Sequence, residues 1–218
     1  MLLLINYLET LALICSIINY KKFETKALKG FLFLLMLTNI VEWGNFYRLF
    51  AIKHSTNWVA NIRNPIEFIF IGWFYSTIIN NTKIKLYIKW LNWFIIVTSV
   101  INLIFFQGFY YLDSYTIILG SCFCLYYIIV YLIQLMKTPN IPNLLLYPYF
   151  WISVGFLFFY TGQSILLSFF QYFLYINDFS SFRTIWYFFI ILINIILYSC
   201  LSIAFFCRLK PTNTLLQE

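Results

Sequence analysis

The sequence predicts an all-α integral membrane protein, built as a bundle of seven transmembrane helices. Of its 218 residues, 63% are hydrophobic and only 10% are charged, whereas a soluble domain is roughly 45–50% apolar and about 25% charged. The apolar residues gather into seven continuous runs, each close to the roughly 20 residues that a helix needs to cross a bilayer. Because the runs do not alternate apolar and polar residues, they do not fit the strands of a membrane β-barrel.

Each run is bounded by residues that end helices or favour water. Two lysines follow the first run, which also lacks the basic start of a signal peptide, so we expect it to be retained. Asn80 and Asn81 mark a turn before the fourth run, and the two prolines of residues 137–143 break the chain before the sixth. The predicted spans are residues 2–20, 30–50, 58–79, 86–106, 114–136, 146–175 and 183–207. No connection is long enough to fold by itself, so residues 1–218 should form a single transmembrane domain.

The basic residues predict the orientation of the bundle. Ten of the 14 lie on one side of the bundle, in or next to the first, third and fifth connections and the C-terminal tail. They are Lys21, Lys22, Lys26, Lys29, Lys83, Lys85, Lys89, Lys137, Arg208 and Lys210. Cytoplasmic loops carry an excess of Lys and Arg, so this side should be cytoplasmic, with the N-terminus outside and the C-terminus inside. The net charge of +7 then reflects topology and contact with anionic lipids, and no nucleic-acid partner is expected. The expected location is a cell membrane, the inner one in a bacterium.

The stretch 61–67, Asn-Ile-Arg-Asn-Pro-Ile-Glu, places charges inside the third span. Charged residues are rare in spans and usually face the bundle interior or a cavity. Arg63 and Glu67 are four residues apart, so they share one helix face and can pair with each other. Glu9 and Glu42 fall in the same outer half of the first two spans. Three carboxyl groups against one guanidinium favour a cationic or proton-donating ligand, unless the extra carboxyl groups are simply protonated.

These residues predict a ligand pocket in the outer half of the bundle, enclosed by the first, second, third, sixth and seventh spans. Its predicted polar wall consists of Glu9, Asn39, Glu42, Arg63, Asn64 and Glu67, with Tyr160, Gln163 and Tyr187 opposite. The alternative interpretation is structural, because polar side chains between membrane helices also stabilise their packing, by about 0.6 kcal/mol each on average. In that case the same residues would be packed without a void.

Other chemistries find little support in the sequence. Cys122 and Cys124 are two residues apart, so they point to different faces of a helix, and we expect no metal site and no cofactor. The single histidine, His54, lies in a predicted outer loop, and no Ser-His-Asp set converges with it. We therefore expect a sensor-like or receptor-like protein that binds a small polar or cationic ligand and signals through a separate partner protein. A small transporter or proton-coupled carrier is the second hypothesis, and an intramembrane enzyme that uses paired glutamates is the third.

Overall fold

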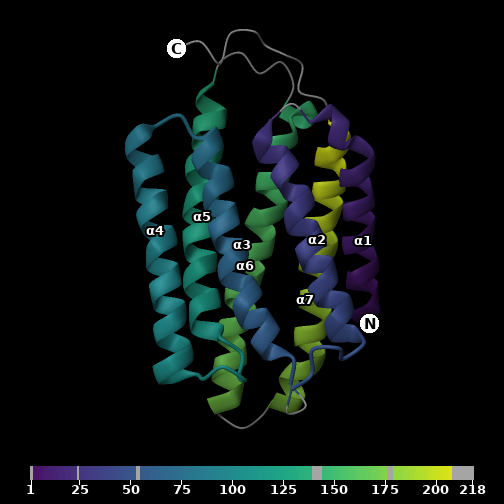
Figure 1. The fold of residues 1–218 in the computed structure, drawn as a ribbon, viewed down its shortest axis with the longest axis vertical. Helices are drawn as coiled ribbons and strands as arrows, with labels where there is room; N and C mark the ends of the chain where they lie inside the picture. Colours follow the sequence, from purple (N-terminus) through teal and green to yellow (C-terminus); the bar gives the residue numbers. More distant parts are fainter. Residues whose placement is uncertain (1, 24, 53–54, 139–143, 176–178, 208–218) are drawn as a thin grey trace.

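Seven long helices run up and down in a computed structural model that describes residues 2–23, 25–52, 55–138, 144–175 and 179–207 (Figure 1). The helices are α1 (Leu2–Asn19), α2 (Lys26–Phe46), α3 (Asn57–Ile78), α4 (Thr82–Ile101), α5 (Ser114–Lys137), α6 (Pro148–Tyr175) and α7 (Phe179–Phe206). Short 3-10 turns lie at Tyr20–Lys22 and Leu144–Leu146, and α4 continues into a π-helical turn at Asn102–Phe106. The prediction of an all-α membrane bundle is confirmed, because six of these helices are long and apolar enough to cross a membrane.

The helix α3 differs from the other six in composition. It has 22 residues, which is long enough to cross a bilayer, but its mean hydropathy falls below that of a membrane span. The cause is the polar stretch near its start, which contains Asn61, Arg63, Asn64 and Glu67. The sequence predicted seven comparable spans, but α3 is less apolar than the other six, and its composition alone does not indicate a membrane span. It depends on the surrounding helices to cover its polar side.

The observed helices begin and end within a few residues of the predicted spans, and the main shifts have a local cause. Helix α2 begins at Lys26, four residues before the predicted start, because the Thr25 hydroxyl accepts a hydrogen bond from the backbone N–H of Leu28 at 3.4 Å. Helix α4 also begins four residues early, at Thr82, because the side chain of Asn81 accepts hydrogen bonds from two N–H groups of its first turn. A polar cap therefore extends each helix beyond its apolar run.

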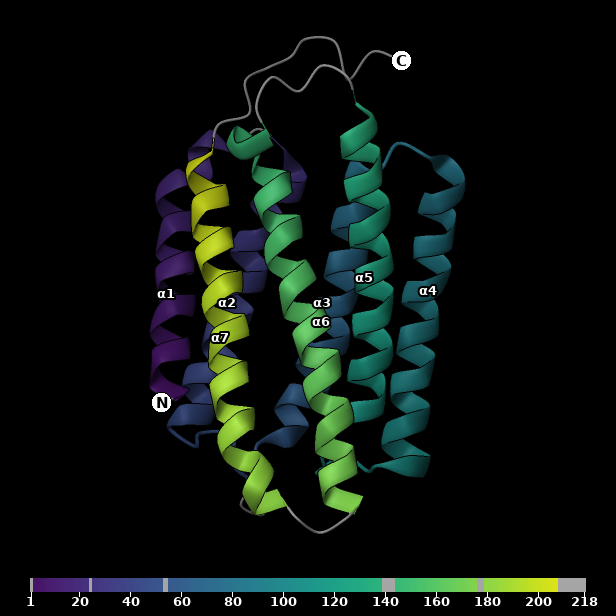
Figure 2. The same cartoon turned by 180° about the vertical axis from the view of Figure 1, so that it is seen from behind.

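Six of the helices form a closed ring, and the seventh lies outside it. In the ring α1 packs on α2, α2 on α3, α3 on α5, α5 on α6, α6 on α7, and α7 again on α1 (Figures 1 and 2). Helix α4 packs against the outer side of α3 and α5. The ring thus encloses a central space to which α4 does not contribute.

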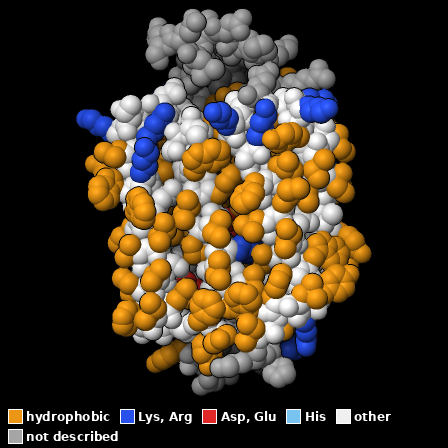
Figure 3. Space-filling view, viewed as in Figure 1, with side chains coloured by type: hydrophobic (Ala, Val, Ile, Leu, Met, Phe, Trp, Pro, Cys, Tyr) orange, Lys and Arg blue, Asp and Glu red, His pale blue; other side chains and the backbone are white. Residues whose placement is uncertain are grey.

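The two ends of the bundle differ in charge. The upper end in Figure 3, which we call the lysine-rich end, carries the basic side chains of the helix ends and connections that are described there. Its described members are Lys21, Lys22, Lys26, Lys29, Lys83, Lys85, Lys89 and Lys137. Arg48 and Arg183 are the basic residues that the described part of the chain places near the opposite end, while Lys53 and Asp178 fall outside the described residues. This asymmetry agrees with a cytoplasmic lysine-rich end, which remains a prediction.

Aromatic side chains fill the interior of the six-helix ring toward the lysine-rich end. Phe31 of α2 lies 4.9 Å from Phe74 of α3, 6.0 Å from Phe156 of α6 and 6.3 Å from Phe205 of α7, measured between ring centroids. All four side chains are almost completely buried. Four helices therefore meet around one aromatic cluster, which closes the central space on this side.

Candidate functional site

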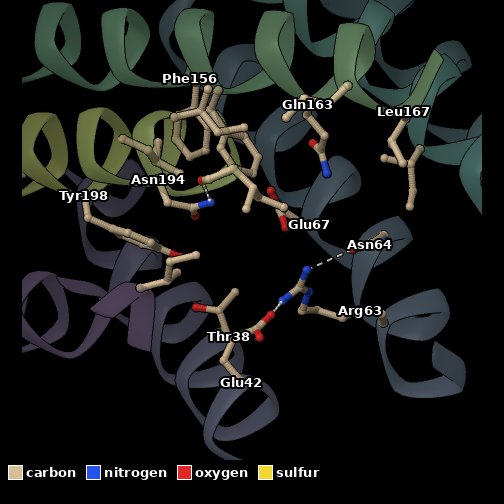
Figure 4. Close-up of a pocket in the computed structure, with 18 of the residues that line it drawn as sticks. Thr38, Glu42, Arg63, Asn64, Glu67, Phe156, Gln163, Leu167, Asn194 and Tyr198 are labelled. Atoms are coloured by element: carbon tan, nitrogen blue, oxygen red, sulfur yellow. Dashed lines mark hydrogen bonds and ion pairs between the residues drawn. The ribbon is translucent and has the colours of Figure 1, made fainter. Parts of the chain in front are cut away.

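A cavity of about 250 Å³ lies inside the ring, in the half away from the lysine-rich end. Its wall includes residues of α1, α2, α3, α5, α6 and α7, and on α3 it extends from Ala60 to Glu67, in the first half of that helix. Most of the lining side chains are apolar. The polar ones are Thr38, Glu42, Arg63, Asn64, Glu67, Gln163, Asn194 and Tyr198 (Figure 4).

An ion pair joins α2 and α3 at this cavity. The Nη1 atom of Arg63 donates a hydrogen bond to Oε1 of Glu42, and Nη2 donates to Oδ1 of Asn64 at 3.2 Å (Figure 4). The side chains of Arg63 and Glu42 are 18% and 32% exposed, so the pair is not sealed from its surroundings. The sequence allowed Arg63 to pair with Glu67 on its own helix or with a carboxylate of a neighbouring helix, and the structure has the neighbouring one.

Glu67 makes a different contact across the same cavity. Its Oε1 accepts a hydrogen bond of 2.9 Å from the phenol of Tyr160, which is completely buried on α6. Tyr160 is held in turn by a stacked contact with Phe156, at 5.5 Å between ring centroids. Within the described part of the chain the Arg63–Glu42 contact is the one ion pair, so Glu67 lines the cavity without a cationic partner.

A third carboxyl group lies one layer behind the wall. Glu9 of α1 is completely buried beside Thr38, but the Thr38 hydroxyl donates to the backbone carbonyls of Leu34 and Leu35, each at 3.2 Å. Among the described residues, neither carboxyl oxygen of Glu9 has a hydrogen-bond partner. Tyr198, which lines the cavity, is within electrostatic reach of Glu9, so the buried acid is close to the site without forming its surface.

Two further buried polar atoms around the cavity lack partners in the described part of the structure. They are Nε of Arg63, a donor, and Oε1 of Gln163, an acceptor. Both residues line the cavity and point toward the same space as Glu67 (Figure 4). Buried polar atoms are nearly always hydrogen-bonded. A surface that binds another molecule typically has such groups: here a donor and an acceptor without partners lie beside the Glu67 carboxyl group, which has no ion-pair partner among the described residues.

The structure brings most of the nine predicted site residues together. Five of them line the cavity: Glu42, Arg63, Asn64, Glu67 and Gln163. Three are buried directly behind the wall: Glu9, Asn39 and Tyr160. Asn39 accepts a hydrogen bond of 2.9 Å from the hydroxyl of Thr10, so it joins α1 to α2. Tyr187 is 36% exposed and does not belong to the cavity wall.

The contribution of α7 lies further along that helix than the sequence predicted. Asn194 and Tyr198 line the cavity, and they follow Tyr187 at helical spacing on the same polar stripe. Because α7 begins at Phe179 and starts beyond the cavity, Tyr187 falls short of it. Helical spacing relates these three residues to one another, but it does not determine where along its length α7 meets the other helices.

The structure adds little to the cysteine and histidine chemistry. Cys122 is exposed and Cys124 is buried, both as free thiols. Within the described residues, no group of three or more His, Cys, Asp or Glu side chains is placed to hold a metal ion. His54 lies outside the described residues.

No protein-family model matches this chain, and no curated protein or solved structure matches it either. The chemistry of the cavity is therefore the basis on which a function can be proposed.

Proposed function

We propose that this polytopic membrane protein is a sensor that binds a small cationic or proton-donating ligand in the cavity. The observation that carries the proposal is the unpaired Glu67 carboxyl group in a mostly apolar cavity enclosed by six helices. Ligand sites are typically apolar concavities with a few converging polar groups. The bound state would be read by a partner protein that contacts the helices or their short connections.

The charges around the cavity support a cation over an anion. Arg63 is neutralised by Glu42, which leaves Glu67 facing the cavity with a single hydrogen bond from the neutral phenol of Tyr160. Glu9 adds a second carboxyl group behind the wall. A ligand with a positive charge or an acidic proton would satisfy Glu67, whereas an anion would be repelled.

The remaining wall suits a protonated amine. The free Oε1 of Gln163 can accept a hydrogen bond from an ammonium N–H. Phe156, Phe159 and Trp186 supply aromatic surface in the same wall, and aromatic faces attract cations when water is excluded. The site thus combines an acceptor, a carboxyl group and aromatic rings around one space.

The aromatic cluster around Phe31 favours a sensor over a carrier. A carrier needs a polar path from the cavity to the other side, and the cluster of Phe31, Phe74, Phe156 and Phe205 occupies that position. A proton-coupled carrier is the second candidate, because Glu9 and Glu67 are within electrostatic range of one another and ionisable groups inside membranes are common in proton relays.

Binding of benzylamine to the full chain in lipid nanodiscs tests the proposal by isothermal titration calorimetry. We expect benzylamine to bind and benzoate not to bind. Glu67→Gln should weaken benzylamine binding about tenfold or more, because a buried charge contact is lost, while the matched control Tyr187→Phe, on the same bundle but outside the cavity, should bind normally. Equal binding of benzoate, or unchanged binding by Glu67→Gln, would contradict the proposal.

Flux measurements separate the two candidates. For a sensor, proteoliposomes that contain the protein should take up labelled benzylamine no faster than protein-free liposomes. Uptake that requires Glu67 would instead establish the carrier and remove the sensor.

A further inference from the structure

The Glu42–Arg63 ion pair connects α2 and α3 at the cavity wall and is partly exposed at the outer surface, and we call the gap that it bridges the side opening. Figure 3 shows acidic and basic atoms at mid-height on the face that α2 and α3 form, surrounded by hydrophobic side chains. The partial exposure of the Glu42 and Arg63 side chains agrees with this view. In a bilayer this face meets lipid chains, so the charged site is open toward the membrane itself.

Toward the lysine-rich end, aromatic rings close the seam between α2 and α3. Gly30 of α2 allows a close approach of α3, since a Cβ atom there would lie 2.8 Å from the Trp73 ring and 2.9 Å from the Phe70 ring. Phe31 also makes an edge-on contact with Phe70, at 5.2 Å between ring centroids. The side opening therefore ends at these rings.

Toward the opposite end, an aromatic roof closes the same seam. The ring of Phe50 packs directly on Gly44 of α2, where a side chain would clash with it. The indole of Trp58 donates a hydrogen bond of 2.7 Å to the Phe50 carbonyl, and Phe109 stacks on Trp58 at 6.3 Å. Between the roof and the Phe31–Phe70 contact, the seam is spanned by the ion pair.

The rim of the side opening is apolar on both sides of that ion pair. Leu34 and Leu35 line the cavity from α2, while Ile62 and Ile66 of α3 are 45% and 40% exposed on the outer surface. An apolar chain that passes beside the ion pair would therefore contact Leu34 and Leu35 inside the cavity and Ile62 and Ile66 at the outer surface. Burial of each methylene group along such a path favours binding.

We propose that the ligand is an amphiphilic amine whose head group binds at Glu67 and Gln163 and whose alkyl chain leaves through the side opening into the bilayer. This inference rests on the proposed function, since it assigns the ligand class and the access route of the same cavity. It explains why a polar site is roofed on the side of water and framed by aliphatic residues on the side of lipid. A purely polar amine would have no use for the lateral opening.

Photolabelling in nanodiscs tests the route. The probe is dodecylamine with a diazirine in the middle of its chain, and the labelled residues are mapped by mass spectrometry. We expect labelling on α2 and α3 around Leu35 and Ile66, competition by unlabelled dodecylamine, and loss of the labelling in Glu67→Gln but not in the control Tyr187→Phe. Dodecanoic acid should not compete, because it carries the opposite charge.

The outcomes separate this inference from the proposed function. Labelling on α6 and α7 instead, or labelling of α2 and α3 that persists in Glu67→Gln, would overturn the lateral route. If butylamine still bound in a Glu67-dependent manner, the proposed function would stand without it. If neither butylamine nor dodecylamine bound, both proposals would fail.

Discussion

Two buried polar clusters begin only two residues apart on α3. The polar groups of the first are hydrogen-bonded within the cluster, whereas the second leaves some of its buried polar atoms without partners among the described residues. In the first, the side chain of Asn61 donates to the carbonyls of Phe109 and Tyr111, at 3.0 and 2.7 Å, and accepts from the backbone N–H of Asp113 at 3.1 Å. In the second, Arg63 and its neighbours surround a cavity and leave buried polar atoms without partners. We call the first the loop knot and the second the cavity cluster.

The loop knot satisfies its polar groups over several elements. Asn102, in the π-helical turn after α4, donates to the Asp113 carboxylate and, at 2.9 Å, to Gln107. Asp113 in turn caps α5 by accepting from the N–H of Thr116 at 3.2 Å. Fully paired networks fix one structure. The comparison therefore indicates that the loop knot positions the α4–α5 connection, whose Leu112 reaches the cavity wall, while the cavity cluster remains free to bind.

The largest effect should come from the loop knot. Asp113→Ala removes the cap of α5, with the acceptor of the Thr116 N–H, and one of the acceptors of Asn102, so it should lower the free energy of unfolding by about 3 kcal/mol. Asp113→Asn keeps an acceptor oxygen and should lose less than about 1 kcal/mol. Unfolding in SDS micelles followed by circular dichroism measures both. An unchanged free energy of unfolding in Asp113→Ala would contradict a structural role of the loop knot.

Arg63→Ala should have the next largest effect, about 2 kcal/mol, because the Glu42–Arg63 pair is partly exposed and sealed pairs lose roughly 3–5. A double-mutant cycle with Glu42→Ala should give a coupling of about 1 kcal/mol, and the cycle with Glu67→Ala a smaller one. The same unfolding measurement applies. Strictly additive losses for Arg63 and Glu42 would argue against the ion pair.

Glu9→Gln should change stability in the opposite direction. The substitution replaces a buried carboxyl group with an amide that cannot ionise, so at a pH where the carboxyl group is ionised stability should rise by about 1 kcal/mol. Asn39→Ala is the matched control, since Asn39 is also buried behind the wall but is hydrogen-bonded, and it should lower the melting temperature in detergent. A loss of stability in Glu9→Gln would show that its carboxyl group is needed for packing.

The smallest change in stability should belong to Glu67→Gln, within about 0.5 kcal/mol, because glutamine can still accept the hydrogen bond from Tyr160. The same variant is expected to lose benzylamine binding, so affinity and stability would be separated. Parallel melting and titration of one preparation checks this. A large loss of stability would move Glu67 from the binding residues to the structural ones.

The sequence predicted the helices and much of the cavity wall, because both depend on local patterns. Apolar runs of membrane length mark the spans, and charges such as Arg63 within a span mark the side that avoids lipid. The partner of Arg63 was not determined by spacing, since Glu67 on the same helix and Glu42 on the next were both within reach. Only the packing of α2 against α3 decides between them.

The position of α4 shows a second limit of sequence patterns. The helix carries Asn92, and polar residues within membrane spans usually face the bundle interior. In the structure Asn92 accepts a hydrogen bond from Tyr127 of α5 at 3.4 Å and lies against Gly72 of α3, so it joins α4 to the outside of the ring. A stripe identifies the side of a helix that contacts protein, but not which neighbour it contacts.

The polar composition of α3 has a consequence for how the chain is inserted into the membrane during synthesis. A single arginine at the centre of a helix costs about 2.5–3.5 kcal/mol for insertion by the translocon, and α3 carries Glu67 and three asparagines in addition. Helix α2 emerges first and brings Glu42, the partner of Arg63. We therefore expect α3 to leave the translocon together with α2 as a hairpin, so that loss of Glu42 would reduce the yield of membrane-integrated protein before it affects the finished fold.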